Sequence, residues 1–425
     1  MSKENSFLYK HGPIMIIGAL FFIFGFVTWA NSVLIPYFQL ICELSVQQAM
    51  LVAFAFYISY FLMAFPASAI LKKTGYKNGM ILGLLIMAVG ALLFLPAAAN
   101  RAYLVFLIGL FVQATGLTLL QTAANPYIVV LGPIEGAAAR MSIMGVCNKL
   151  AGAIAPLLLI GVIVQHADEI DQVKEQLLTA TEAQKTFILN DMSGRLLMPY
   201  LGISVVLIAL AIIIRLSRLP EISDPEDAPD TQVSKNKRTL FSHTYLLLGT
   251  FAIFCAVGVE VLVIDTIISY GEALGKSFRE AKYFASYTLV VMIISYCTGI
   301  VVIPKFISQR RTLAICAVLG IVLGSCVVFL GDGMSIWFMV LLGFCNALLW
   351  PAIWPLALDG LGSYTSRGSA LLIMGIVGGA VSPLLYGYMT DMTSHQAGYI
   401  IFIPYYLFLL YYAVYGYKVG KSTSS

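Results

Sequence analysis

The chain has 425 residues, of which 60% are apolar and 11% are charged, and its formal net charge is +4. This composition excludes an ordinary soluble domain, in which about 25% of residues are charged. The small positive charge follows from the Lys and Arg residues of the loops, so it indicates neither a nucleic-acid partner nor an anionic ligand.

Apolar stretches long enough to cross a bilayer recur along the whole chain. A membrane-spanning helix needs about 20 mainly apolar residues. About twelve spans are expected, near residues 13–38, 48–71, 77–98, 101–130, 138–164, 198–216, 243–270, 283–304, 312–330, 334–358, 369–389 and 398–417. The first span is too long for a signal peptide and lacks a small-residue cleavage site, so we expect it to remain as an anchor in the lipid bilayer.

The basic residues predict the orientation of these spans. If the N-terminus is cytoplasmic, 17 of the 25 Lys and Arg residues fall on the cytoplasmic side, 7 fall outside and one, Lys149, lies within a span. Cytoplasmic loops of membrane proteins carry an excess of Lys and Arg. We therefore expect a multi-pass protein of the cell inner membrane with both termini in the cytoplasm.

Cysteine and histidine give no sign of a metal or cofactor site. The seven cysteines are scattered through apolar spans without a CxxC pair or a neighbouring histidine, so they read as small apolar residues. The histidines lie near span ends or in loops, at His11, His166, His243 and His395. The sequence shows no phosphate-binding loop and no pairing of a nucleophile with a base. We expect no metal, no cofactor and no enzymatic activity.

The two halves of the chain repeat each other. One set of matches is 233 residues apart: Gly25 with Gly258, Ser32 with Asp265, Tyr37 with Tyr270, Lys72 with Lys305, and Lys77 with Arg310. A second set is 227 residues apart: Arg140 with Arg367, Ser142 with Ser369, Gly152 with Gly379, and Pro156 with Pro383. Parallel repeats of six spans are the architecture of major-facilitator transporters, which bind substrate near mid-membrane between the halves.

The repeat predicts an all-α membrane protein of twelve transmembrane helices in two pseudo-symmetric six-helix bundles. The N-terminal bundle is expected over residues 1–218, a polar cytoplasmic linker over 219–241 and the C-terminal bundle over 242–425. A second polar segment, 166–195, is expected outside the membrane, with a short amphipathic helix over the sequence DQVKEQLL. The sequence does not predict what that segment does.

Amide and aromatic side chains mark candidate ligand contacts. In the fourth span Gln121 and Asn125 are four residues apart and share one helical face, and Asn346 and Trp350 have the same spacing in the tenth span. Amides that donate and accept beside an aromatic face suit a polyhydroxylated ring. The alternatives are hydrogen bonds between helices for the amides and a core or interfacial position for the tryptophan.

The first and fifth spans add further candidates. Asn31 follows Trp29 in the first span, and Asn148 precedes Lys149 in the fifth. We expect Asn31 and Asn148 to join the same polar pocket. Four glycines of the fifth and eleventh spans are expected to be close-packing positions rather than ligand contacts: Gly145, Gly152, Gly375 and Gly379.

Three charged residues lie deep in the spans. Glu260 and Asp265 lie in the seventh span, where an ionised acid costs roughly 2.5–3.5 kcal/mol, and Lys149 is the only basic residue at comparable depth. Charge balance predicts that Lys149 pairs with one of these acids, although a snorkelling lysine is an alternative. The acids are about 140° apart on a regular helix, so both face one cavity only if the helix breaks near Gly258. We expect these three residues to serve coupling.

Several segments resemble one transporter family. The stretches FGFVTWANSVLIPYF, LQTAANPYIVVLGP, GVEV, LLWPAIWPLALDGLG and GSALLIMGIVGGAVSPLLYGYMTD together resemble the fucose–galactose–glucose:proton symporter branch of the major facilitators, most of all its bacterial glucose/galactose members. The resemblance implies Asp at Ser32 and Glu at Gln121 for a fucose-type carrier, so the fucose-type coupling scheme does not transfer. Asn148 matches the fucose permeases, and Gln121 and Glu260 match the glucose-type members.

Together these features predict a monomeric hexose transporter, for a sugar such as glucose or galactose, that works by alternating access with symport of a proton or sodium ion. Within transport, the alternatives are a carrier of amino sugars or fucose and a drug:proton antiporter. Outside transport, the alternative is a membrane sugar sensor without turnover.

Overall fold

The computed structural model describes residues 3–130, 137–163, 169–217, 243–303, 305–331, 333–361 and 364–421, and every regular element in these ranges is a helix. The first half of the chain contains α1 (Lys3–Trp29), α2 (Asn31–Ile41), α3 (Val46–Ala99), α4 (Tyr103–Val130), α5 (Ala137–Ile163), α6 (Glu169–Thr179), α7 (Glu182–Gly194) and α8 (Leu197–Leu216). The second half contains α9 (Thr244–Ala273), α10 (Phe278–Val302), α11 (Gln309–Phe329), α12 (Ser335–Leu358), α13 (Thr365–Met374), η5 (Gly375–Val377), α14 (Gly378–Met392), α15 (His395–Gly398), η6 (Tyr399–Ile401), α16 (Phe402–Val414) and η7 (Gly416–Lys418).

The number of spans agrees with the sequence. Within the described ranges, 11 helical segments are long and apolar enough to cross a membrane. One of them, Gln47–Ala99, has 53 residues, which is about twice what a bilayer core requires. Gly75 interrupts it with φ 76° and ψ 167°, a conformation that favours glycine. This segment therefore holds two spans, and the prediction of twelve transmembrane helices is confirmed.

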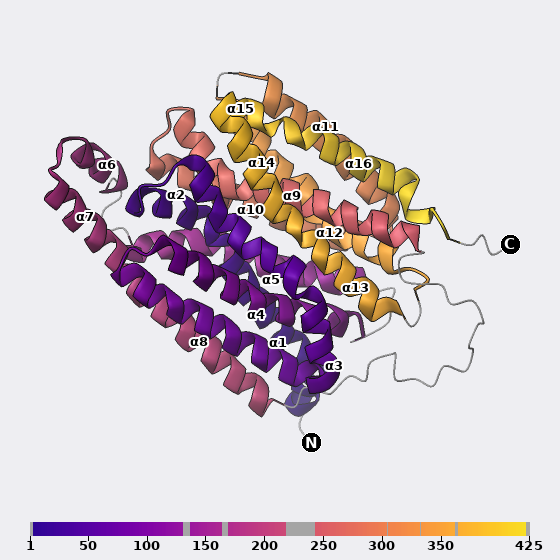
Figure 1. The fold of residues 1–425 in the computed structure, drawn as a ribbon. Coiled ribbons are helices and arrows are strands. Elements are labelled where there is room, and N and C mark those ends of the chain that lie inside the picture. The colour runs from indigo at the N-terminus through magenta and orange to yellow at the C-terminus, as the bar shows by residue number, and fades with distance from the viewer. Residues whose placement is uncertain are drawn as a thin grey trace.

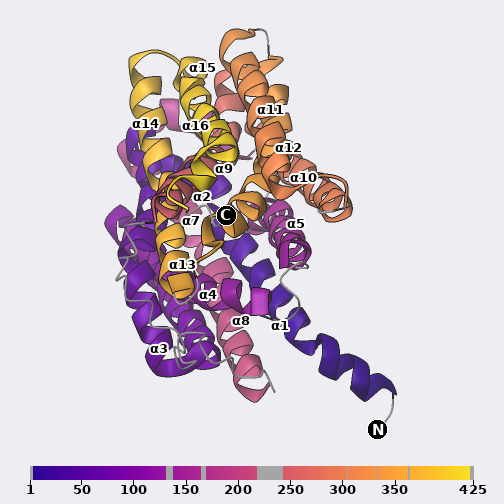
Figure 2. The same cartoon turned by 90° about the vertical axis from the view of Figure 1, so that its right-hand side faces the viewer.

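The helices form two groups that meet along their length. Helices α1 to α8 pack on one another in the first group, and α9 to η7 do so in the second (Figure 1). Between the groups, α5 packs against α10 and α3 packs against α14, and α5 and α10 also lie close together in the turned view of Figure 2. We call the groups the N-terminal and C-terminal halves. The predicted linker, 219–241, lies outside the described residues, so the exact domain boundaries remain a prediction.

The repeat extends to helix packing. A Cβ atom at Gly25 of α1 would overlap the carbonyl oxygen of Asn148 in α5, and a Cβ atom at Gly258 of α9 would lie 2.8 Å from the Tyr405 ring and overlap the Ser382 hydroxyl of α14. Two glycines that match in sequence thus mark two matching helix contacts. At each of the four predicted close-packing glycines, an added Cβ atom would also lie within 3 Å of a neighbouring residue: Gly145, Gly152, Gly375 and Gly379.

A helical hairpin lies on the side of the molecule away from the chain ends. Figure 1 places the beginning of α1 and the C-terminal end of the described chain on one side, which we call the terminal side, and α6 and α15 on the other, the far side. Helix α6 contains the predicted amphipathic segment. Lys174 of α6 pairs with Glu272 at the end of α9, 2.5 Å apart. The hairpin of α6 and α7 therefore connects the two halves on the far side.

Candidate functional site

A cavity of about 130 Å³ lies between the two halves. The N-terminal half lines it with α1, α3, α4 and α5, and the C-terminal half with α9, α10, α12 and η5. Its polar lining consists of Thr28, Gln121, Asn125, Asn148, Lys149 and Glu260. Its aromatic lining consists of Phe21, Phe24, Trp29, Tyr57, Tyr60, Tyr296 and Trp350. A pocket of this kind presents a few directed polar groups on an aromatic wall.

Three predicted amides come together in this cavity. Gln121 donates from Nε2 to the Tyr60 hydroxyl at 3.1 Å, which joins α4 to α3. Asn148 accepts at Oδ1 from the Trp29 indole nitrogen at 3.0 Å, which joins α5 to α1. Asn125 lies one turn beyond Gln121 on the same face of α4 and is 3% exposed. Hydrogen bonds with neighbouring side chains thus orient two of the three amides, Gln121 and Asn148, in the cavity wall.

The two candidates of the tenth span, Asn346 and Trp350, lie in different surroundings. Trp350 lines the cavity and stacks on Trp354, with ring centres 5.0 Å apart. Asn346 is 1% exposed and is not part of the lining; its Oδ1 accepts from the Tyr406 hydroxyl at 2.5 Å. Positions four apart differ by about 40° around a helix, and on α12 this difference directs Asn346 toward α16. Its placement in the pocket is therefore corrected to a contact between helices.

Asn31 is the first residue of α2, but its side chain lies outside the described part of the structure. Its predicted contact with the ligand remains a prediction.

The predicted ion pair is present, with Glu260 as the acid. Lys149 Nζ of α5 contacts Glu260 Oε1 of α9, and the two side chains are 4% and 13% exposed. Lys149 Nζ also lies 3.7 Å from the centre of the Trp29 ring, a cation–π contact. The pair joins the two halves at the cavity wall, and it satisfies two charges that would be costly alone at this depth.

Asp265 does not share the cavity with Glu260. Helix α9 continues without a break from Thr244 to Ala273, so the break near Gly258 that would turn both acids inward does not occur. Asp265 is 0% exposed and outside the cavity lining. The condition under which both acids would face one cavity is therefore not met, and the coupling role of Asp265 stays a prediction.

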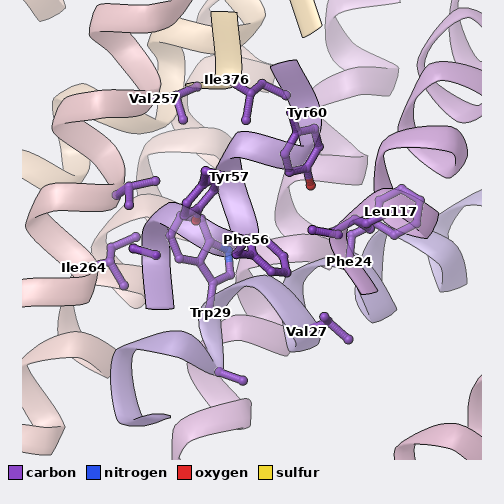
Figure 3. Close-up of a cluster of buried hydrophobic side chains, with 14 of the residues drawn as sticks. Phe24, Val27, Trp29, Phe56, Tyr57, Tyr60, Leu117, Val257, Ile264 and Ile376 are labelled. Carbon is purple, nitrogen blue, oxygen red and sulfur yellow. The ribbon is translucent and has the colours of Figure 1, made fainter. Parts of the chain in front are cut away.

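The sequence prediction missed most of the aromatic wall. Tyr57 and Tyr60 of α3 line the cavity, as does Tyr296 of α10. Figure 3 shows Tyr57 and Tyr60 on one stretch of helix, in the region that also contains Val257 and Ile264 of α9. A signal existed, because tyrosines three apart lie on the same helical face. It was hidden among the 23 tyrosines and 25 phenylalanines of the chain.

Comparison with known proteins gives consistent results at the level of family, sequence and fold. The chain matches the Major Facilitator Superfamily over residues 17–380. It is 32% identical over 402 residues to the glucose/galactose transporter of Brucella abortus, covering 94% of this chain and 92% of that protein. It is 30% identical over 395 residues to the L-fucose-proton symporter of Escherichia coli, covering 90% and 88%. Its structure matches the crystal structure of the E. coli fucose:proton symporter with a TM-score of 0.76 and 26% identity, covering 97% and 100% of the two chains.

Proposed function

The chain belongs to the major facilitator superfamily, and from this premise we propose that it is an inner-membrane sugar transporter that works by alternating access. The observation that carries the proposal is the cavity between the halves, with side chains of both halves in its wall. Transporters of this architecture bind substrate between their repeats and expose the site to each side in turn as the repeats rock. We propose that both termini are cytoplasmic and that the protein works as a monomer.

The cargo that best fits the lining is a hexose such as glucose or galactose. Trp350 offers a flat apolar face to the C–H side of a pyranose ring. Asn148 keeps its bond from Trp29 at one Oδ1 lone pair, and an amide oxygen has a second lone pair for a sugar hydroxyl. The similarity to proteins named glucose/galactose transporter, at 32% identity, supports this choice.

We further propose that transport is coupled to a cation. The chain has Ser32 and Gln121 where its resemblance to fucose permeases implies acids, so coupling must rest on other residues. Lys149 lies against Glu260 and takes the place beside that carboxylate that a coupling cation would occupy. Because the pair spans both halves, rocking of the halves must change it. Similarity to the L-fucose-proton symporters favours the proton over sodium as the coupling ion.

The proposal is tested with purified protein in proteoliposomes and a panel of labelled D-glucose, D-galactose, L-fucose and N-acetylglucosamine. We expect uptake and exchange of D-glucose or D-galactose. Preference for L-fucose or N-acetylglucosamine would replace the hexose assignment with one of the alternative carriers. Binding without exchange would identify a sensor, and proton-driven export of an apolar cation without sugar exchange would identify a drug antiporter.

Shortening Trp350 is expected to weaken sugar binding. In Trp350→Ala, the half-saturating sugar concentration should rise about tenfold, because an aromatic contact contributes roughly 0.5–1.5 kcal/mol beyond its buried area and 1.4 kcal/mol is a factor of ten. The matched control on the same helix is Trp337→Ala, since Trp337 is 50% exposed and outside the cavity lining. Concentration dependence of initial uptake measures both. Equal half-saturation in the two variants would remove Trp350 from the sugar site.

A further inference from the structure

Two buried polar groups at the boundary between the halves have no hydrogen-bond partner among the residues that the structure describes. Asp265 of α9 is 0% exposed and both carboxylate oxygens lack a partner, and Tyr57 of α3 is 2% exposed and its hydroxyl lacks one. An ionised carboxylate buried in this way is costly, whereas a protonated carboxyl group carries no charge and can donate a hydrogen bond. Binding of a proton by Asp265 would therefore lower the free energy of the structure in which the two halves bury this residue.

The surroundings of Asp265 depend on how the halves meet. Lys149 of α5 and Tyr57 of α3 interact electrostatically with Asp265, and both belong to the opposite half. The Tyr57 ring is fixed at this boundary by α14, because a Cβ atom at Gly379 would lie 2.9 Å from it. Separation of the halves would remove both groups from Asp265 and let water take their place.

The position of Asp265 along α9 indicates the side from which water would reach it. Asp265 is five residues beyond Glu260, about 7.5 Å farther along the helix toward the far side. In this structure α2 packs against α9, and Asp265 itself is 0% exposed. Asp265 is thus sealed between the cavity and the far side. It would be reached by water when the halves open toward the far side.

We propose, on the basis of the proposed transport function, that Asp265 is the proton-binding site of this carrier. A proton from water on the far side adds to one carboxylate oxygen while the halves are open there. Closure then buries the neutral carboxyl group at the boundary between the halves. The proton returns to water on the terminal side when the halves move again, so no other reactant is needed. Both groups that act on Asp265 line the sugar cavity, which places the proton and sugar sites next to each other.

The surroundings favour a proton over a metal cation. A metal ion requires several oxygen ligands, and the described ranges contain no group of three or more His, Cys, Asp and Glu residues that could hold one. Tyr57 and Lys149 supply one hydroxyl and one positive charge near Asp265, which do not make an oxygen cage. A sodium gradient is therefore included in the test as the competing driving force.

The test compares the parent protein with Asp265→Asn in proteoliposomes, using labelled D-glucose and D-galactose. With a one-unit inward pH gradient and one proton per sugar, the parent should accumulate sugar about tenfold. Asp265→Asn should only equalise the concentrations, whereas exchange with preloaded sugar should continue, because Asp265 does not line the cavity. The matched control is Asp391→Asn, an exposed aspartate on α14, which should accumulate sugar like the parent.

The outcomes separate this inference from the proposed function. Absence of sugar exchange in the parent would overturn the proposed function itself. If the parent exchanges sugar and Asp265→Asn still accumulates it tenfold, only the assignment of the proton site is overturned. The same holds if a sodium gradient alone drives accumulation by the parent. Loss of exchange together with accumulation in a folded Asp265→Asn protein would also overturn it, because Asp265 would then serve the sugar site.

Two further measurements apply if Asp265→Asn does not fold. Tyr57→Phe removes only the hydroxyl of Tyr57, and it should shift the pH at which accumulation is half-maximal; an unchanged pH profile contradicts the proposed site. Infrared spectra of the purified parent should contain the carbonyl band of a protonated carboxyl group that responds to Tyr57→Phe. A band that is absent, or that does not respond, assigns the proton elsewhere.

Discussion

Glu260→Gln is expected to lower the thermal stability of the protein and to abolish accumulation of sugar against a gradient. The substitution leaves the Lys149 ammonium, 4% exposed, without its carboxylate partner. Removal of one member of a buried ion pair costs about 3–5 kcal/mol, and water that reaches Glu260 from the cavity places this case at the lower end. Thermal unfolding of the protein in detergent and uptake in proteoliposomes measure the two effects.

A double variant separates the ion pair from other roles of Glu260. Lys149→Met combined with Glu260→Gln removes both charges, so it should recover much of the stability that Glu260→Gln loses. The matched control is Glu182→Gln, because Glu182 also pairs with a lysine but is 91% exposed, and exposed pairs contribute little. If Glu260→Gln and the double variant are equally unstable, Lys149 and Glu260 do not stabilise each other in the folded protein.

The elements of this protein that depend on composition could be predicted from the sequence. The twelve spans follow from apolar length, and the matching helix contacts at Gly25 and Gly258 follow from the repeat. The pair of Lys149 with Glu260 follows from charge balance, since a deep lysine in lipid has very few acids within reach. Each of these predictions depends on a feature that few residues of the chain share, so few alternative placements compete with it.

The direction in which an individual side chain points could not be predicted from composition, the repeat or charge balance. Asn346 and Trp350 have the spacing of one helical face, but α12 is buried on most sides, so Trp350 faces the cavity while Asn346 bonds Tyr406. Tyr57 and Tyr60 were missed for a related reason: aromatic residues in a membrane protein face lipid, core and cavity alike. Only the packing of the two halves shows which of these aromatic residues face the cavity and which face lipid or the core.

The placement of Asp265 connects the repeat with coupling. The resemblance to fucose permeases implies an acid at Ser32, and Asp265 is the residue that corresponds to Ser32 at the offset of 233. In this chain the acid thus occupies the matching position of the other half. If Asp265 binds the proton, the acid that serves coupling in this chain lies on the second repeat.

Gly25→Ala is expected to disrupt both folding and transport. The added methyl group would overlap the Asn148 carbonyl oxygen and lie 2.8 Å from the Asn148 Cα, and a backbone cannot move aside as a flexible side chain can. Helices α1 and α5 must then separate, which should lower stability by at least the roughly 1–3 kcal/mol typical of overpacking. The separation also breaks the contact of Asn148 with Trp29 at the cavity, so uptake should be lost.

Two other glycines provide the scale for this prediction. A Cβ atom at Gly18, two turns earlier on α1, would lie 3.7 Å from the Cys147 sulfur, and one at Gly161 of α5 would meet nothing within 4 Å. Gly18→Ala should therefore be nearly neutral. Gly161→Ala should be neutral or stabilising, since alanine favours a helix over glycine by about 1 kcal/mol. Thermal unfolding and sugar exchange of the three variants test the order. Gly25→Ala with the stability and exchange rate of Gly18→Ala would show that α1 and α5 are not in contact at Gly25, and the positions assigned to Asn148 and Lys149 in the cavity wall would then have to change with them.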